Sequence, residues 1–377
     1  MKNSSSIILH LSLIEGIGPS FFARCINGLD KKDLSQLYDM SISDVKNIFG
    51  FNDEKSQKLI MGLADMSRLE KELMLIERHS ISWATVADTE YPELLKQIHL
   101  PPLVCYWSGN LSATANSIAV IGSRDADSYA QEVIDQLIPE LVMHDWVIVS
   151  GGARGADTMA HTATLAAGGT TIAVLGSGLL RPYPPENKQL FEKIIQSNGA
   201  VLSPFALQAE PLPIHFPARN RVIAGMSRGC IVVQAAVKSG ARITADFCLT
   251  QGKEVFAIPG HINNILSAGC HALIQQGAKL TTSIADILVE FGQDVQEQQM
   301  HMYTPAIKQS SSIKPIRDFQ ELPIKEKIRT ICKSPSSVDE LIEQTNIPLI
   351  ELTKILFDMQ LEGAISQNMT GLWQKHS

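Results

Sequence analysis

Basic side chains are concentrated in one stretch of this chain, residues 216–253, which reads FPARNRVIAGMSRGCIVVQAAVKSGARITADFCLTQGK. Against a single acid, Asp246, the stretch holds six lysines and arginines: Arg219, Arg221, Arg228, Lys238, Arg242 and Lys253. The whole chain has a formal net charge of −7, so this is a local reversal of sign. The turn Lys238-Ser239-Gly240 could bring backbone N–H groups close to a phosphate. We therefore expect a polyanion to bind here.

The first residues of this stretch, HFPARNR, suit an unpaired nucleic-acid strand. Phe216 lies beside Arg219, Asn220 and Arg221, and exposed bases stack on aromatic rings while phosphates pair with guanidinium groups. In the alternative interpretation, Phe216 belongs to the core and the arginines pair with carboxylates elsewhere. The shortage of nearby acids favours the first interpretation.

The turn at residues 238–240 also has two interpretations. VKSGARITAD places Lys238, Ser239 and Gly240 after a buried strand, with Thr244 one turn into the next helix. A serine-capped helix start with no ligand is the plainer one. A lysine ahead of the cap and an arginine just inside the helix favour an anion site.

Two glycine-bearing turns lie upstream. In IAVIGSRDADSYAQEVI, Ser123 and Arg124 occupy the point where a phosphate would meet a helix N-terminus, although an ordinary strand-to-helix turn explains them equally well. The dinucleotide fingerprint G-x-G-x-x-G is absent from this segment. SGGARGADTMAH adds Gly152 and Arg154 at the start of a second helix.

The same second motif holds residues that could do acid–base chemistry. We expect Asp157 to cap the helix through its carboxylate. His161 lies four residues later on the same helix face, and we expect a packed or hydrogen-bonded core histidine. Because no partner nucleophile or metal-ligand set accompanies them, the sequence predicts no catalytic residue, no metal and no cofactor.

The elements that position these residues form an α/β fold. From Ser117 to about Gly292, short β-branched runs alternate with helix-length segments, which predicts a Rossmann-like, doubly wound, mostly parallel sheet. The expected strands are residues 118–123, 146–152, 171–177, 200–203, 230–236 and 254–260. Most of these runs end in glycine or serine, at the edge where such sheets bind ligands.

The flanking segments have different patterns. Residues 1–110 show helical periodicity and end in a proline-rich and aromatic connection, which predicts a helical domain of the SAM or helix–hairpin–helix kind before a sheet domain at 111–292. Residues 293–320 are rich in Gln, Ser and Pro and are predicted to be a flexible linker. Residues 321–377 read as three helices and a terminal hairpin, the order of a winged helix.

Composition narrows the functional class further. The six cysteines are far apart and have no metal-binding spacing, so we expect reduced, mostly buried thiols. No apolar run approaches the length of a membrane span, and no cleavage site follows the N-terminal run. These features predict a soluble cytoplasmic protein with no membrane partner.

Two terminal features are ambiguous. The sequence IEGIGPSFFARCING resembles a single degenerate helix–hairpin–helix turn, and a plain helix-ending glycine explains it equally well. The expected last helix carries Lys354 against Glu351, Asp358 and Glu362. Because a negatively charged helix repels phosphates, we expect it to contact protein rather than duplex DNA.

Taken together, the motifs GSR, SGGARGAD..AH, T.AVLG.GL...YPPEN, HFP.RNR.IAG.S, V..A..KSG..ITA and VFA.PG, in this order over roughly residues 90–290, resemble the DNA-processing protein A (DprA/Smf) family. The resemblance implies a dimer that binds and protects single-stranded DNA and helps load a RecA-type recombinase onto it in natural transformation. It places DNA contacts at Ser123, Arg124, Gly152, Arg154, residues 219–221 and residues 238–240.

Two residues depart from the family pattern. Pro204 stands where the family commonly has an acid, and Gln234 stands where it commonly has Glu. Both departures remove negative charge from the ligand-binding edge. They disfavour the alternative of a nucleotide-processing enzyme like the phosphoribohydrolases, whose P-G-G-x-G-T-x-x-E signature supplies a catalytic Glu that KSGARITAD lacks. The sequence therefore predicts a protein that is not an enzyme.

Overall fold

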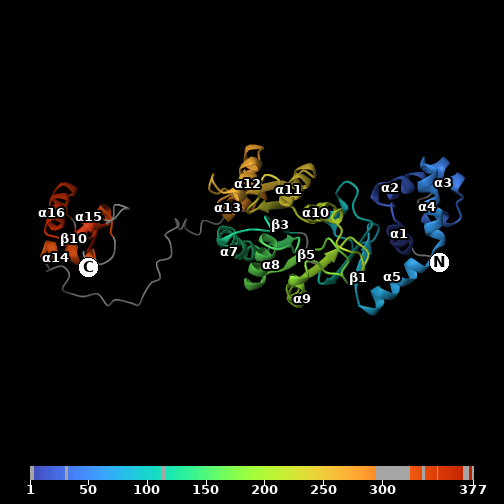
Figure 1. Cartoon of the computed structure of the whole chain (residues 1–377), viewed down its shortest axis with the longest axis horizontal. Helices are drawn as coiled ribbons and strands as arrows, with labels where there is room; N and C mark the ends of the chain where they lie inside the picture. Colours follow the sequence, from blue (N-terminus) through green and yellow to red (C-terminus); the bar gives the residue numbers. More distant parts are fainter. Residues whose placement is uncertain are drawn as a thin grey trace. The chain divides into compact units, whose positions relative to one another are not determined.

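The computed structural model describes residues 4–29, 33–111, 116–293, 323–332, 336–345, 347–367 and 373–375. The chain divides into two compact units, Met1–Gln298 and Gln299–Ser377, and Figure 1 colours them along the sequence. Within the described ranges, no helix combines the length and the apolarity that a bilayer crossing requires.

A nine-stranded sheet forms the centre of the larger unit, in the order β1-β2-β6-β5-β4-β3-β7-β8-β9. The pairs from β6 through β9 are parallel, whereas β1 and β2 run antiparallel at one edge. The strands are β1 (Ser82–Thr85), β2 (Val104–Gly109), β3 (Ser117–Ile121), β4 (Val147–Ser150), β5 (Thr171–Val174), β6 (Ala200–Ser203), β7 (Gly229–Val232), β8 (Glu254–Ala257) and β9 (Lys279–Leu280). The predicted doubly wound, mostly parallel sheet is confirmed.

The direction of winding reverses at β3. The chain continues from β3 to β4, β5 and β6 on one side, and β7, β8 and β9 then follow on the other side of β3. In sheets of this kind, ligands bind beyond the carboxyl ends of the strands at the reversal point. The sheet therefore points to the ends of β3 and β7.

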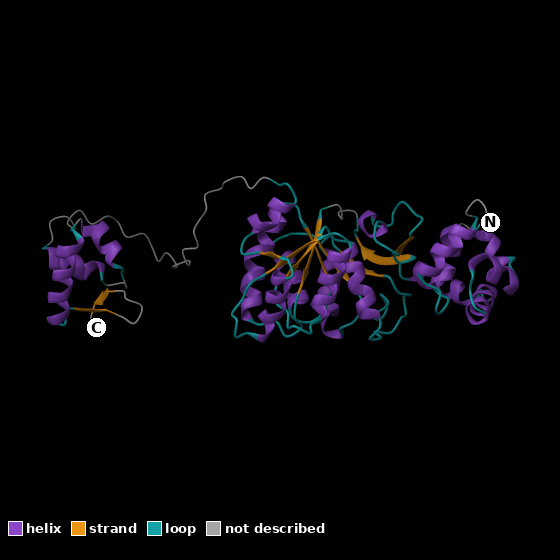
Figure 2. Cartoon of the chain, turned by 90° about the horizontal axis from the view of Figure 1, so that it is seen from above, coloured by secondary structure: helices purple, strands orange, loops and turns teal. Residues whose placement is uncertain are grey.

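Helices cover both faces of the sheet, as Figure 2 shows. One face packs on α7, α8, α9 and α13, and the other on α6, α10, α11 and α12. Alternate residues of β3 serve the two faces, because Ile118 and Val120 join one cluster and Ala119 and Ile121 the other. These helices are α6 (Glu93–Lys96), α7 (Ser128–Met143), α8 (Ala156–Ala166), α9 (Lys188–Gln196), α10 (His215–Gly225), α11 (Gly240–Thr250), α12 (Ile265–Gln275) and α13 (Ile284–Glu290), and a short 3₁₀ turn, η3 (Pro185–Asn187), precedes α9.

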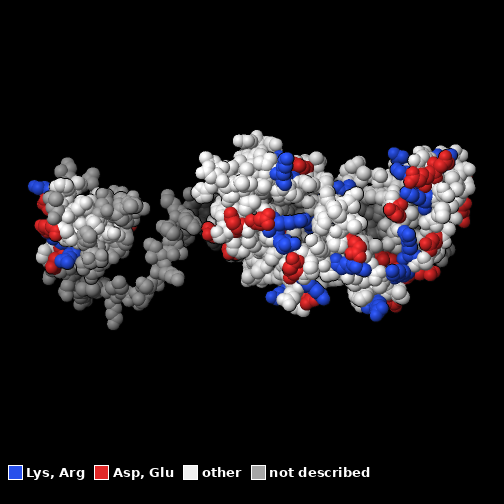
Figure 3. Space-filling view, viewed as in Figure 1, with Lys and Arg blue, Asp and Glu red and all other residues white. Residues whose placement is uncertain are grey.

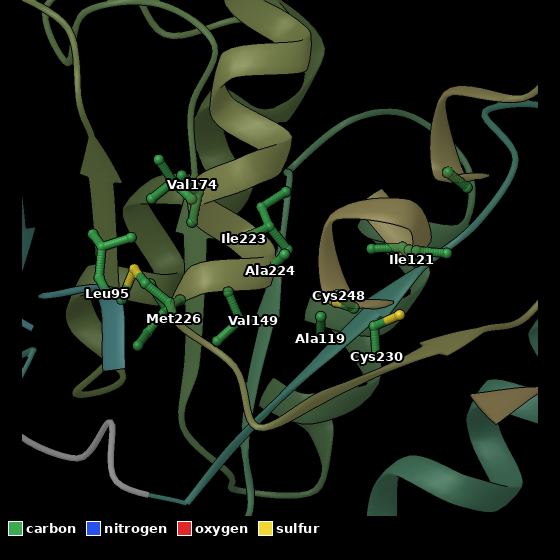
Figure 4. Packing of buried hydrophobic residues seen from close by; sticks show 14 of the residues in the cluster. Leu95, Ala119, Ile121, Val149, Val174, Ile223, Ala224, Met226, Cys230 and Cys248 are labelled. Carbon is green, nitrogen blue, oxygen red and sulfur yellow. The ribbon is translucent and has the colours of Figure 1, made fainter. Parts of the chain in front are cut away.

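Small side chains let α10 and α11 lie close to the sheet. Figure 4 shows Ala224 of α10 and Cys248 of α11 above Ala119 and Cys230, and all four side chains are fully buried. All six cysteines of the chain are buried free thiols, as predicted. Burial raises the pKa of the Cys105 thiol to about 12, so it stays protonated and unreactive at neutral pH.

The N-terminal helices pack on the β2 edge of the sheet. They are α1 (Ser4–Ser12), α2 (Pro19–Gly28), η2 (Leu34–Tyr38), α3 (Ile42–Phe49), α4 (Asp53–Ala64) and α5 (Ser67–Arg78). Their apolar cluster includes Val104 of β2 and Leu207 from the loop after β6. The buried carboxylate of Glu72 on α5 accepts a hydrogen bond from the Leu207 N–H at 2.7 Å. The helical segment is thus fixed to the loop that leads into α10.

Part of the segment predicted as helix and connection is strand. The proline-rich and aromatic stretch before residue 110 contains β2, which pairs with both β1 and β6. The segment was misassigned because β1 has four residues and β2 follows two prolines, which leaves too little alternation for a periodicity test. The two-residue strand β9 was not predicted either.

The smaller unit contains three helices and a hairpin. The helices α14 (Ile324–Ile331), α15 (Val338–Thr345) and α16 (Leu349–Leu361) share an apolar cluster with Ile365 and Trp373. Strands β10 (Ile365–Gln367) and β11 (Trp373–Lys375) pair antiparallel. This order fits the winged helix predicted for residues 321–377. The predicted linker at 293–320 lies outside the described residues, except for Gln293.

Candidate nucleic-acid interface

An open pocket of about 450 Å³ lies where the winding of the sheet reverses. It is bounded by the turn after β3, the loop after β7, and the first turns of α10 and α11. Nine of the predicted contact residues line it: Ser123, Arg124, Phe216, Arg219, Asn220, Lys238, Ser239, Gly240 and Thr244. The positive side chains of Arg124, Arg219 and Lys238 therefore converge on one cavity.

The turn after β3 is held tightly against the neighbouring elements. The N–H of Ser123 donates to the Gln234 carbonyl at 2.7 Å, and the Ser123 carbonyl accepts from the N–H of Ala156 at 3.1 Å. A Cβ at Gly155, whose φ is +71°, would lie 2.4 Å from the Ser123 carbonyl oxygen and 2.5 Å from that of Arg124. Only glycine allows the two backbone segments to come this close, and their contact fixes the position of the Arg124 backbone.

Arg124 and Lys238 are the exposed cations of the pocket. The guanidinium carbon of Arg124 lies 5.5 Å from the centre of the Phe216 ring, so the ring orients the charge without neutralising it. In the described part of the chain, neither Arg124 nor Lys238 forms an ion pair with a carboxylate. Both charges are available to a ligand.

The helix α11 presents its N-terminus to the pocket. Ser239 caps the helix by accepting a hydrogen bond from the Ala241 N–H at 3.2 Å. No atom lies within 4 Å of a Cβ built on Gly240, so the backbone there is open to a ligand. A helix N-terminus carries partial positive charge, which adds to that of Lys238. Thr244 is 2% exposed and packs beneath this turn.

Arg219 is buried, unlike the other cations of the pocket. It is 5% exposed, and its guanidinium donates to the carbonyls of Gly151 and, at 2.5 Å, Val174. Burial lowers its pKa to about 10, while the charge of Asp157 opposes that change. Its Nε donates to Asn220 Oδ1 at 3.1 Å, and Asn220 donates to the Gly240 carbonyl at 3.3 Å. Arg219 thus joins the ends of β4 and β5 to α10 and α11.

Asp157 does not cap α8, in contrast to the expectation from sequence. Gly155 occupies the N-cap position, and Asp157 is a buried residue of the first turn whose carboxylate accepts from the Ala153 N–H at 3.2 Å. Burial raises the pKa of Asp157, and Arg219 opposes that rise. The carboxylate therefore faces inward, to the buried guanidinium.

His161 is a core residue, as expected. It is fully buried, and its Nδ1 lies 2.7 Å from Thr171 Oγ1, which itself donates to the Ile148 carbonyl. Nδ1 therefore carries the proton, and Nε2 is buried with no hydrogen-bond partner among the residues that the structure describes. Burial lowers the pKa of this imidazole to about 3, so it stays neutral at physiological pH.

The hydrogen bonds of Gln234 account for an amide at this position. Its Nε2 donates to Asp127 Oδ1 at 2.8 Å, and its Oε1 accepts from the Asp127 N–H at 3.2 Å. Asp127 caps α7. A glutamate at this position would set a second carboxylate against Asp127, so the neutral amide suits this chain.

A smaller recess adjoins the pocket and contains Arg154. It is lined by Arg124, Arg154, Tyr183, Pro184 and Phe216, among others. Arg154 is exposed, and its Nε lies 3.6 Å from Oε1 of Glu186. Because both side chains face water, this ion pair contributes little energy. The ring of Tyr183 meets Phe216 edge-on at 5.9 Å.

Two predicted contact residues lie away from the pocket surface. Gly152 is buried, with φ +62°, and a Cβ there would lie 2.6 Å from the Phe191 ring, so this glycine serves packing. Arg221 donates to the His99 carbonyl at 3.2 Å and lines a separate cleft with Phe247 and Lys253. Leu266 of α12 and Ile243 of α11 line the main pocket, and no local sequence signal indicated them.

The positive character of the site is local. Asp125 and Asp157 are also among the residues that line the pocket. Figure 3 shows basic and acidic side chains intermixed over one face of the larger unit. Within the described ranges, no three His, Cys, Asp or Glu side chains gather as metal ligands would. The arrangement can hold an anion, aided by an aromatic ring.

Comparison with known proteins identifies relatives of this chain. Residues 82–292 match the family model of DNA recombination-mediator protein A. The DNA processing protein DprA of Streptococcus pneumoniae is 38% identical over 276 residues, which are 68% of this chain and 97% of that protein. Protein Smf of Escherichia coli is 36% identical over 285 residues, 74% of each chain.

Two solved structures are similar to the fold. The X-ray structure of DNA processing protein A from Streptococcus pneumoniae has a TM-score of 0.67 and 36% identity, and it covers 77% of this chain and 99% of that one. A structure of DNA processing protein A from Helicobacter pylori, which concerns that protein's single-stranded DNA binding mode, has a TM-score of 0.51 and 28% identity. It covers 56% of this chain and 95% of that one.

Proposed function

This chain belongs to the DNA recombination-mediator protein A family, and on that premise we propose that it binds single-stranded DNA in the pocket at the ends of β3 and β7. One observation carries the proposal. Two exposed cations, Arg124 and Lys238, which form no ion pair with a carboxylate of the described residues, flank an aromatic ring and the open N-terminus of α11 in a single cavity. A strand with exposed bases and spaced phosphates matches that combination.

The residues divide into two roles. Arg124, Lys238 and the backbone at residues 239–240 bind phosphates, Ser123 orients the first turn, and Phe216 offers its ring to a base. Arg219, Asn220 and Thr244 position these groups from below, and Gly152 belongs with them as a packing residue. Arg154 extends the cationic surface along the adjoining recess. In this proposal, fewer residues contact DNA directly than the sequence predicts.

We propose further that the bound strand is protected and passed to a RecA-type recombinase during natural transformation and recombination. Binding through phosphates leaves most base edges free for a partner. Two copies of the chain would grip two stretches of one strand and gain avidity. Ile262 and Ile265, which are 89% and 76% exposed, offer an apolar surface for that second copy.

The pocket supports binding better than catalysis. His161 is neutral and enclosed, and the buried Asp157 carboxylate accepts a hydrogen bond from the Ala153 N–H and interacts electrostatically with Arg219. Gln234 offers no carboxylate and is held by Asp127. A nucleotide-processing reaction of the phosphoribohydrolase kind needs a carboxylate that is free to act on the substrate. We therefore propose a non-enzymatic role that needs no cofactor.

A competition experiment tests this function. Purified protein is bound to a labelled single strand and challenged with unlabelled single-stranded or duplex DNA at two salt concentrations. We expect the single strand to compete far better, and binding to weaken as salt rises. Equal competition by duplex, or the absence of binding to either DNA, would refute the proposal.

A further inference from the structure

The loop between β6 and α10 exposes two apolar side chains shortly before the pocket-lining residues of α10. Leu212 and Ile214 are 49% and 75% exposed. Ile214 immediately precedes α10, whose first residues include Phe216 and Pro217, both of which line the pocket. Exposed aliphatic side chains within four residues of the pocket-lining Phe216 offer a contact surface for an apolar group.

The loop is rigidly built. The His215 ring stacks on Phe205 at 4.2 Å, and His215 Nδ1 lies 2.9 Å from the Glu210 carbonyl. The Leu212 carbonyl accepts from the His215 N–H at 2.9 Å. Prolines at 211 and 213 restrict the backbone on both sides of Leu212. Leu212 and Ile214 are therefore presented outward by a fixed backbone.

The far end of the loop is also fixed. The Leu207 carbonyl accepts from the Leu180 N–H, and the Ala209 carbonyl from the Gly178 N–H, both at 2.9 Å. Glu210 lies 2.5 Å from Arg181 in an ion pair. These hydrogen bonds and this ion pair hold the loop, while the side chains of Leu212 and Ile214 stay exposed.

We propose that Leu212 and Ile214 contact the bases of the strand whose phosphates lie in the pocket. The inference rests on the proposed function. Unpaired bases expose apolar faces that duplex DNA hides within its stack, so an aliphatic surface beside a phosphate site favours a single strand. The two side chains add affinity that depends on bases and not on charge.

The test distinguishes protein contacts to bases from protein contacts to phosphates. The affinities of the full chain for a short oligothymidylate and for an abasic strand of equal length are measured by fluorescence anisotropy at one salt concentration. We expect the double variant Leu212→Ser/Ile214→Ser to lose about tenfold in affinity for oligothymidylate, equivalent to about 1.4 kcal/mol. Its affinity for the abasic strand should change by less than about twofold.

A matched control uses apolar residues of similar exposure that lie farther along the chain from any pocket-lining residue. Met61 and Leu249 are 64% and 46% exposed, and Met61→Ser/Leu249→Ser should leave both affinities unchanged. Equal losses for the two strands in Leu212→Ser/Ile214→Ser, or no loss for either, would overturn the inference. The second result would point to a protein partner for the loop. If the wild-type chain bound neither strand, the proposed function itself would fail.

Discussion

Replacing Arg219 with methionine should destabilise the sheet unit strongly. The substitution removes the positive charge that opposes the burial of the Asp157 carboxylate, and losing the partner of a buried charge costs at most about 3–5 kcal/mol. It also leaves the Gly151 and Val174 carbonyls without the guanidinium donor. Each unsatisfied carbonyl costs about 1–3 kcal/mol of stability if no water replaces the guanidinium. The free energy of unfolding of a typical domain is about 5–15 kcal/mol. We therefore expect a loss of roughly 4 kcal/mol, since part of the site relaxes.

Urea unfolding followed by circular dichroism measures this loss. Arg221→Met is the matched control, because Arg221 lies on the same helix, is half-buried and donates to the His99 carbonyl. It should lose only about 1 kcal/mol. Asp157→Asn in the Arg219→Met background should recover part of the loss, since it removes the unpaired charge. A loss below about 1 kcal/mol for Arg219→Met, or strict additivity with Asp157→Asn, would refute the assignment of Arg219 as a buried clamp.

Three further predictions concern stability and assembly. The pKa of His161 is about 3 in the folded chain and near 6.5 in the unfolded chain, so unfolding takes up a proton between these two pH values. The free energy of unfolding should therefore fall by up to about 1.4 kcal/mol per pH unit as the pH drops through that window. Urea titrations of His161→Leu should lack this pH dependence. Gly155→Ala should lose clearly more stability and DNA affinity than Gly168→Ala, which has a similar φ of +73° but no atom near its Cβ; equal losses would show that the collision with the Ser123–Arg124 turn is unimportant. Ile262→Asp/Ile265→Asp should sediment as a monomer under conditions in which the wild-type chain is a dimer, and an unchanged dimer would place the interface elsewhere.

The strands of the parallel sheet were predictable because the signal for each was local. Buried strands need β-branched runs, and the turns at their carboxyl ends need glycine or serine, so sequence alone placed Ser123 and Lys238 at one edge. The antiparallel strands β1 and β2 were missed because their pairing partners are distant in sequence and their own runs are short.

The roles of the arginines in α10 were harder to predict. HFPARNR was interpreted as a run of contacts, but the segment is helical, and residues on a helix share a face only at spacings of three or four. Arg219 and Asn220 lie three and four residues after Phe216 and line the pocket with it, whereas Arg221, five residues after Phe216, lines another cleft. The burial of Arg219 was not predictable, because it depends on carbonyls at the ends of β4 and β5.

The salt dependence of single-stranded DNA affinity is the most direct test of a phosphate-binding pocket. In wild type and in Arg124→Ala, Lys238→Ala and Arg124→Ala/Lys238→Ala, the logarithm of the association constant is plotted against the logarithm of salt concentration. Each lost phosphate contact should make the slope shallower by about 0.7, and the double variant by about 1.4. Arg221→Ala should leave the slope unchanged. Slopes that stay at the wild-type value in the double variant would contradict the account.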